Sequence, residues 1–144
     1  MAGPWLYCIS RNARKTFELK AGSVPVSMEA YERLLQNGSL SEDRYWGITI
    51  NRARVKDGDE VYIYAGTSEG NRGIIGYAEV QGVELIEGDY CLHMKFDLEK
   101  CRLLCAEPIS AVTVRQWVPF PRRNVCDLEP FSTELQQLLP WNRP

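Results

Sequence analysis

Aromatic and basic side chains occur next to each other at several places in this sequence. The aromatic residues concerned are Trp5, Tyr7, Tyr45, Trp46, Tyr64, Trp117 and Phe120. Aromatic rings can stack on an unpaired base while arginines hold the phosphates that flank it, so this combination is typical of a base-binding pocket. The alternative for each ring is packing in the hydrophobic core. Tyr45 and Trp46 are the better pocket candidates, because they open a predicted strand directly after a polar segment.

Three segments of the chain, 11–20, 44–56 and 115–123, are basic. Together they hold 11 Lys and Arg residues against one acidic residue, although the net charge of the whole chain is −2. Arginine outnumbers lysine by 12 to 5 in the chain, and its planar guanidinium suits phosphates and base edges. A basic face on an acidic body is compatible with nucleic-acid binding. The alternative is three unrelated surface patches that pair with carboxylates from the acidic segments.

The cysteines and the single histidine limit the possible catalytic and metal chemistry. The five cysteines are Cys8, Cys91, Cys101, Cys105 and Cys126, and none forms a Cys-x-x-Cys pair. We therefore expect free thiols in a reducing compartment, mostly in the core, and no zinc site. His93 lies in an alternating segment that predicts a solvent-facing strand residue, and any catalytic triad would have to use it. We predict no catalytic residue, no metal and no cofactor.

The hydrophobic pattern predicts one α+β domain over residues 1–144. Strands are expected at 5–10, 46–50, 60–64, 73–83, 90–104 and 109–114. A helix is expected over 27–37, capped by Ser27 and ended by Gly38, and a short helix within 131–141, with Thr133 and Gln136 spaced as a capping box. Successive strands joined by short turns favour a small barrel of about six strands with flanking short helices. No apolar run is long enough to span a membrane, and no secretory signal is visible, so we expect a cytoplasmic or nucleoid-associated protein.

Several short motifs, in order along the chain, resemble the EVE domain of the PUA-like superfamily, which also contains the YTH and ASCH domains. They are Trp46-Gly47-Ile48, the Gly-Asp turn and strand of 56–64, and the Gly-x-x-Gly-x-Ala-x-Val pattern of 73–80. The segment 5–10 also resembles the first strand of that domain, and the region of Pro108 and Ile109 its last barrel strand. The resemblance implies a PUA-like β-barrel.

The resemblance also implies a reader of modified bases without enzymatic activity. Such a module flips a base, most often 5-methylcytosine-type cytosine in DNA, into an aromatic cage. Trp46 matches the tryptophan that opens the pocket strand. Ser10 and Asn12 match polar positions that contact the base edge, and Tyr64 matches an aromatic at a strand end. The second cage aromatic is open between Trp117, Phe120 and Tyr90, and Tyr45 is a further base-contact candidate.

Arginines of the basic segments are the expected contacts to the nucleic-acid backbone. These candidates are Arg11, Arg14, Arg52, Arg54, Arg122 and Arg123. We expect a monomer whose partner is modified DNA, with a separate or fused nuclease as a further partner and no membrane contact. One alternative is an RNA reader of the YTH or PUA type, which would use the same pocket chemistry. The other is an ASCH-type small hydrolase, for which Lys15, Thr16 and Glu18 form the one close grouping of the required residue types.

Overall fold

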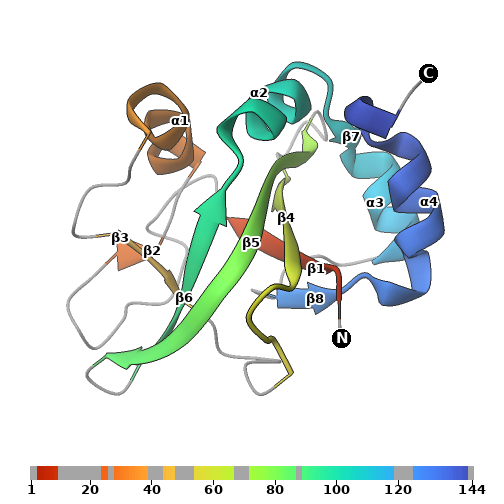
Figure 1. The fold of residues 1–144 in the computed structure, drawn as a ribbon. Coiled ribbons are helices and arrows are strands. Elements are labelled where there is room, and N and C mark those ends of the chain that lie inside the picture. Colours follow the sequence, from red (N-terminus) through yellow and green to blue (C-terminus); the bar gives the residue numbers. More distant parts are fainter. Residues whose placement is uncertain are drawn as a thin grey trace.

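The computed structural model describes residues 3–9, 24–25, 28–38, 44–47, 54–66, 72–86, 89–118 and 125–142 of the chain. It shows an α+β fold in which a mixed sheet carries short helices on both sides (Figure 1). The strands are β1 (Trp5–Ile9), β2 (Val24–Pro25), β3 (Arg44–Gly47), β4 (Glu60–Ala65), β5 (Gly73–Ile86), β6 (Asp89–Phe96), β7 (Ile109–Ser110) and β8 (Val125–Asp127). The predicted α+β class is therefore confirmed.

The strands pair in the order β2-β3-β6-β5-β4-β1-β8, and β7 pairs with β5 off this path. Two pairs are parallel, β1 with β4 and β2 with β3, and the other pairs are antiparallel. In the described part of the chain β2 and β8 end the order without pairing to each other, so this sheet is not closed into a barrel.

Among the described residues, four α-helices and two short 3-10 helices cover the sheet. They are α1 (Met28–Asn37), α2 (Leu98–Ala106), α3 (Ala111–Trp117), η2 (Glu129–Phe131), α4 (Ser132–Leu138) and η3 (Pro140–Asn142). Helix α1 confirms the predicted helix, and Gly38 ends it at a φ of 80° while its N–H bonds to the carbonyl of Leu34. No described helix combines the length and the apolar character needed to cross a membrane.

The prediction of a strand through residue 104 is wrong, because β6 ends at Phe96 and α2 follows. The Asp97 side chain accepts a hydrogen bond from the backbone N–H of Lys100 and thereby caps the helix. Cys101 and Leu104 are the buried residues of α2, and their spacing of three places both on one helix face. The alternating pattern covers residues 90–96, which do form a strand, and the extension of the strand to residue 104 overlooked Asp97 as a helix cap.

The strand predicted over 109–114 is also wrong beyond Ser110. Strand β7 holds only Ile109 and Ser110, and the Ser110 side chain then caps α3 by accepting from the N–H of Thr113. β-branched residues favour strands, but here Val114 packs inward from a helix while Val112 stays exposed. The local propensity was overridden by the cap and by packing of α3 on the sheet.

The predicted C-terminal helix is present, but its start differs from the prediction. Helix α4 begins at Ser132, directly after η2, and Phe131 occupies the capping position without a side-chain hydrogen bond. Thr133 therefore lies inside the first turn and does not form the predicted capping box. The preceding 3-10 turn supplies the start of the helix instead.

Two hydrophobic cores lie on the two faces of the sheet. Trp5, Tyr7 and Ile9 of β1 face a core shared with α1, whereas Leu6 faces a second core shared with α3 and α4. This alternation follows from the period of two in a strand. Helix α2 contributes Cys101 to the first core and Leu104 to the second. Figure 1 shows α1 on one side of the sheet and α3 with α4 on the other.

Candidate functional site

Three strand ends meet at one edge of the sheet. Strand β1 runs parallel to β4, so that Ile9 lies beside Ala65 at the carboxyl ends of both strands. Strand β8 runs antiparallel to β1 and begins at the same edge, where Val125 pairs with Tyr7. The segment after Ile9 thus leaves the sheet where the segment before Val125 enters it.

Most of the predicted polar and basic contacts belong to the segments that adjoin this edge. Ser10, Arg11, Asn12 and Arg14 follow β1 in sequence, and Arg122 and Arg123 precede β8. All six of these residues, together with Arg52, Phe120 and the Lys15, Thr16 and Glu18 grouping, lie outside the described residues. The structure shows where the segments that contain the first six residues connect to β1 and to β8.

Tyr64 is part of the second core. It lies beside Cys8 in the parallel register of β1 and β4, and only 4% of it is exposed. Burial raises the pKa of its hydroxyl, and the charge of the nearby Arg115 guanidinium opposes this effect. The ring is therefore packed inside the protein, close to an arginine of the basic segment 115–123.

Tyr45 and Trp46 lie on β3, and strands β6 and β5 lie between β3 and β4 in the sheet. Trp46 pairs with Leu92 of β6, and Leu92 pairs in turn with Val83 of β5. Tyr64 instead pairs with Ile74, near the other end of the long strand β5. The described pairing thus does not bring Trp46 and Tyr64 together. Nothing is described of the side chains of Tyr45 and Trp46.

Trp117 ends helix α3 and is half-buried against the second core. Its ring stacks on Phe131, with ring centroids 6.0 Å apart and an interplanar angle of 13°. One face of Trp117 is therefore already covered by the chain itself. Tyr90, the other described cage candidate, is half-buried on β6 against the first core.

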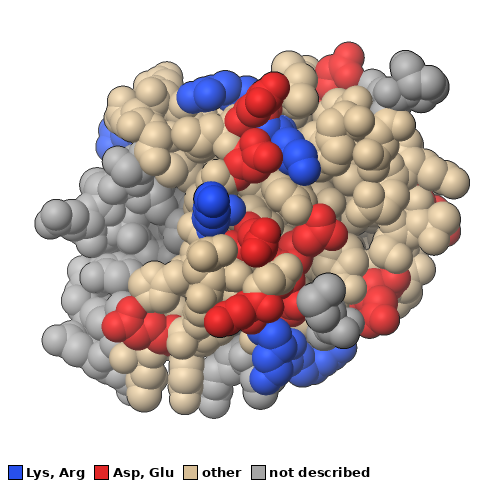
Figure 2. All heavy atoms as spheres, in the orientation of Figure 1, with Lys and Arg blue, Asp and Glu red and all other residues tan. Residues whose placement is uncertain are grey.

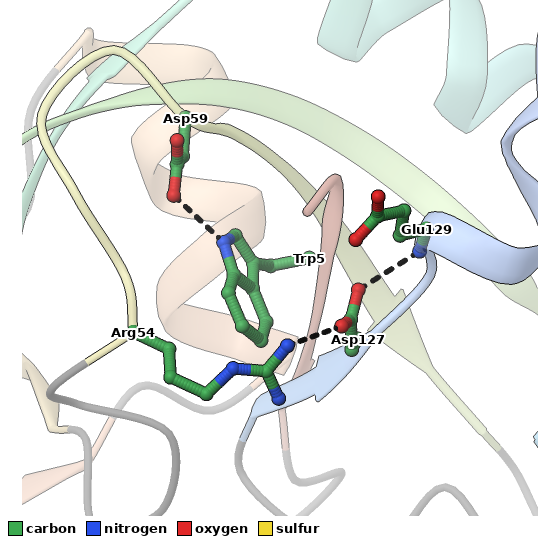
Figure 3. Close-up of polar contacts among 5 residues, drawn as sticks. All are labelled: Trp5, Arg54, Asp59, Asp127 and Glu129. Atoms are coloured by element: carbon green, nitrogen blue, oxygen red, sulfur yellow. Dashed lines mark hydrogen bonds and ion pairs between the residues drawn. The ribbon is translucent and has the colours of Figure 1, made fainter. Parts of the chain in front are cut away.

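Arg54 pairs with a carboxylate and stacks on a tryptophan, as Figure 3 shows. Its Nη2 lies 2.8 Å from Oδ2 of Asp127, and its guanidinium lies 5.2 Å from the ring centroid of Trp5. Asp127 also accepts a hydrogen bond from the N–H of Glu129. Arg54 is thus paired with an acidic residue that is distant in sequence, which is the alternative to a role in nucleic-acid binding.

Charges of both signs mix on the surface formed by β5 and β6. Glu79 pairs with Lys95 across these strands, and exposed His93 contacts Glu84. In Figure 2 acidic side chains run through the middle of this face, with basic ones beside them. The exposed strand position predicted for His93 is confirmed. Among the described residues of this face, acidic and basic side chains are mixed.

Sequence reasoning missed a contact between two thiols. Cys8 of β1 and Cys126 of β8 pack against the same core and interact with each other, and both are half-buried cysteines outside any disulfide. This interaction lowers the pKa of Cys126, and with burial it raises the pKa of Cys8. The sequence could have suggested this contact only through the position of both cysteines in short strand-like segments near opposite ends of the chain.

Among the described residues, no group of three or more His, Cys, Asp and Glu side chains is placed to hold a metal ion. Comparison of the chain with protein-family models, with curated proteins and with solved structures found no match. The resemblance to the EVE domain thus rests on the sequence motifs alone.

Proposed function

We propose that this chain is a non-catalytic module that binds nucleic acid, flips one modified base out of its duplex and holds it in an aromatic pocket. The preferred base is a 5-methylcytosine-type cytosine in DNA. The meeting of the ends of β1, β4 and β8 carries the proposal. At this edge β1 leads into the segment with the base-edge candidates Ser10 and Asn12, and the segment with Arg122 and Arg123 leads into β8.

The pocket aromatic in this proposal is Trp46, with Tyr45 beside it. Tyr64 supports the end of β1 from within the core rather than stacking on the base, because its ring is buried. Trp117 can offer at most the face that Phe131 leaves free. Stacking of a base on one aromatic ring contributes about 1–3 kcal/mol, which is comparable to the cost of flipping the base out of a duplex.

For Trp46 to act together with the end of β1, the sheet has to curl. Strand β2 pairs with β3 at one end of the order and β8 pairs with β1 at the other. Closure of β2 onto β8 would produce a PUA-like barrel and bring β3 toward β1. Nuclear Overhauser contacts between Val24–Pro25 and Val125–Asp127 would support closure. Assigned spectra without any such contact would leave Trp46 far from Ser10 and contradict a shared pocket.

The binding test compares duplex DNA that carries one 5-methylcytosine with the same duplex carrying cytosine, 5-hydroxymethylcytosine or N6-methyladenine. We expect the tightest binding to a modified cytosine, measured by fluorescence polarisation, and an affinity that falls as salt rises. Equal affinity for modified and unmodified duplexes would contradict base reading. Tighter binding to a matched RNA would assign the module to RNA.

Variants separate the base contact from the phosphate contacts. Trp46→Ala should weaken binding to the modified duplex by about tenfold or more and reduce the preference for it, because one stacking partner is lost. Arg122→Ala should weaken binding to all duplexes and lower the salt slope by about 1. Arg102→Ala is the control, because this arginine of α2 lies outside the three basic segments and already donates to the carbonyl of Leu35 on α1. An equal effect of all three changes would contradict the proposed site.

A further inference from the structure

We propose that Cys8 and Cys126 form a reversible disulfide when the protein meets hydrogen peroxide, so that the contact between β1 and β8 is a redox modification site. The sheet register brings the two residues together. Leu6 lies opposite Cys126, and Cys8 follows two residues later on the same face of β1. The two cysteines are thus diagonal neighbours on adjacent antiparallel strands.

The two side chains face the same core. Both residues are half-buried at the margin of the second core, where a small oxidant can reach them. Diagonal neighbours have Cα atoms about 7–8 Å apart, whereas a disulfide usually joins Cα atoms less than about 7 Å apart, so β8 has to move toward β1 when the bond forms. Strand β8 has only three residues, which makes such a shift possible.

The two thiols differ in their acidity in the way that the reaction needs. The hydrogen bond from Cys8 stabilises the thiolate of Cys126 and lowers the pKa of Cys126. The same interaction, together with burial, raises the pKa of Cys8. We therefore assign the attack on the peroxide to Cys126 and the resolving step to Cys8, because the thiolate is the nucleophilic form.

The oxidation proceeds in two balanced steps. The Cys126 thiolate attacks one oxygen of the peroxide, the O–O bond breaks, and a sulfenic acid and hydroxide form. The hydroxide takes the proton of Cys8, and the Cys8 sulfur then attacks the sulfenic sulfur. The S–O bond breaks, the departing oxygen leaves as water once protonated, and the disulfide remains. In sum, two thiols and one hydrogen peroxide give one disulfide and two waters, and a dithiol reductant reverses the change.

Helix α2 and its neighbours provide an internal comparison. Cys101 and Cys105 are one helical turn apart, and each thiol donates to a backbone carbonyl, of Tyr77 and of Ile75 respectively. Burial raises the pKa of both thiols. Cys91 is buried on β6. Burial disfavours the thiolates of Cys101 and Cys105, so we expect both to react more slowly with peroxide than Cys126.

The test uses the full chain in its folded, reduced state. The protein is treated with about one equivalent of hydrogen peroxide, the remaining thiols are blocked with N-ethylmaleimide, and the peptides are mapped by mass spectrometry without reduction. We expect the Cys8–Cys126 disulfide to be the first product and dithiothreitol to remove it. Oxidation of Cys101, Cys105 or Cys91 before Cys126, or modification of Cys126 without a link to Cys8, would overturn the proposal.

Two variants and one control define the roles of the sulfurs. In Cys8→Ser the sulfenic acid of Cys126 should persist and be captured by dimedone, whereas Cys126→Ser should show no early oxidation at Cys8. Cys105→Ser should still form the Cys8–Cys126 disulfide. The circular dichroism spectrum reports whether each variant folds, and the mapping of the unmodified chain decides the proposal even if one variant does not fold. Dimedone capture at Cys8 instead of Cys126 would reverse the assigned roles and overturn the mechanism.

A consequence for binding rests on the proposed function. Cys8 lies beside Tyr64, whose hydroxyl is near Arg115, and it precedes Ser10 by two residues. A shift of β8 toward β1 would therefore alter the edge assigned to the nucleic acid, and oxidised protein should bind the modified duplex more weakly. If the disulfide forms while binding does not change, only this coupling fails. If no DNA binds at all, the disulfide map remains a valid test of the redox site.

Discussion

At the scale of single residues, the contact between Trp5 and Asp59 joins the first strand to the turn before β4. The Trp5 indole N–H donates to Oδ2 of Asp59 at 3.0 Å, and the N–H of Lys56 donates to the same oxygen. Both residues are almost fully buried, with exposures of 0% for Trp5 and 1% for Asp59. Figure 3 shows the indole between Asp59 on one side and Arg54 on the other.

Loss of this carboxylate should destabilise the protein. Asp59→Ala leaves the indole N–H and the Lys56 N–H without their acceptor, and a buried donor without a partner costs about 1–3 kcal/mol. The free energy of unfolding in urea measures the effect. Asp57→Ala in the same turn is the matched control, because Asp57 is exposed, and it should change stability by less than about 0.5 kcal/mol. Equal losses in both variants would contradict the assigned role of Asp59.

At the scale of elements, Gly76 of β5 allows helix α1 to approach the sheet. A Cβ atom at Gly76 would overlap the Tyr31 hydroxyl, which donates to the carbonyl of Ile75 at 2.7 Å. At Gly82, in the same strand, the nearest atom to such a Cβ would be Oδ1 of Asp57 at 4.0 Å. Two glycines of one strand therefore have different tolerance for a methyl group.

Gly76→Ala should lower the free energy of unfolding by about 1–3 kcal/mol, because the methyl group displaces Tyr31 and overpacks the first core. Gly82→Ala should be neutral or slightly stabilising, because alanine reduces the entropy of the unfolded chain and meets no close atom. Denaturant midpoints of the two variants provide the measurement. A destabilisation of Gly82→Ala as large as that of Gly76→Ala would show that the close approach of Tyr31 is not the cause.

The elements differ in how far the sequence predicted them. The buried strands β1 and β4 and the helix α1 were predicted because their periodicity and turn residues agree, as with Gly38 and Gly58, both at positive φ. Helices α2 and α3 were assigned to strands, because both are short and rich in apolar or β-branched residues. The side chains of Asp97 and Ser110 cap the first turns of these helices. The local sequence is also compatible with strands, and only the tertiary packing decides in favour of the helices.

At the scale of the whole molecule, buried hydroxyls make stability depend on alkaline pH. Burial is the largest cause that raises the pKa of Tyr31, Tyr62, Tyr64 and Tyr77 above the ordinary value. Below the unfolded pKa of about 10 the tyrosines are protonated in both states, and their contribution is fully present. Above it the unfolded chain loses protons first, so stability falls as pH rises toward the folded pKa values.

The free energy of unfolding should therefore decrease as pH rises from about 9 to about 11, by about 1.4 kcal/mol over the whole range for each of Tyr31 and Tyr62, and by less for Tyr64 and Tyr77. Urea unfolding across this range measures the slope. Cys101 and Cys105 act in the same direction, because burial raises the pKa of both thiols. Tyr31→Phe removes one of these hydroxyls, together with its hydrogen bond to the carbonyl of Ile75, and should reduce the slope. A free energy that stays constant over this range would contradict the prediction.

The sequence by itself determined the α+β class, the buried first strand, the exposed histidine and the helix α1, because these follow from spacing between near neighbours in the chain. The tertiary structure decided what the candidate site residues touch. It buried Tyr64, covered one face of Trp117 with Phe131, paired Arg54 with Asp127 and joined Cys8 to Cys126. Each of these contacts links residues that are distant in sequence, and strand order and register, which no local pattern encodes, bring them together.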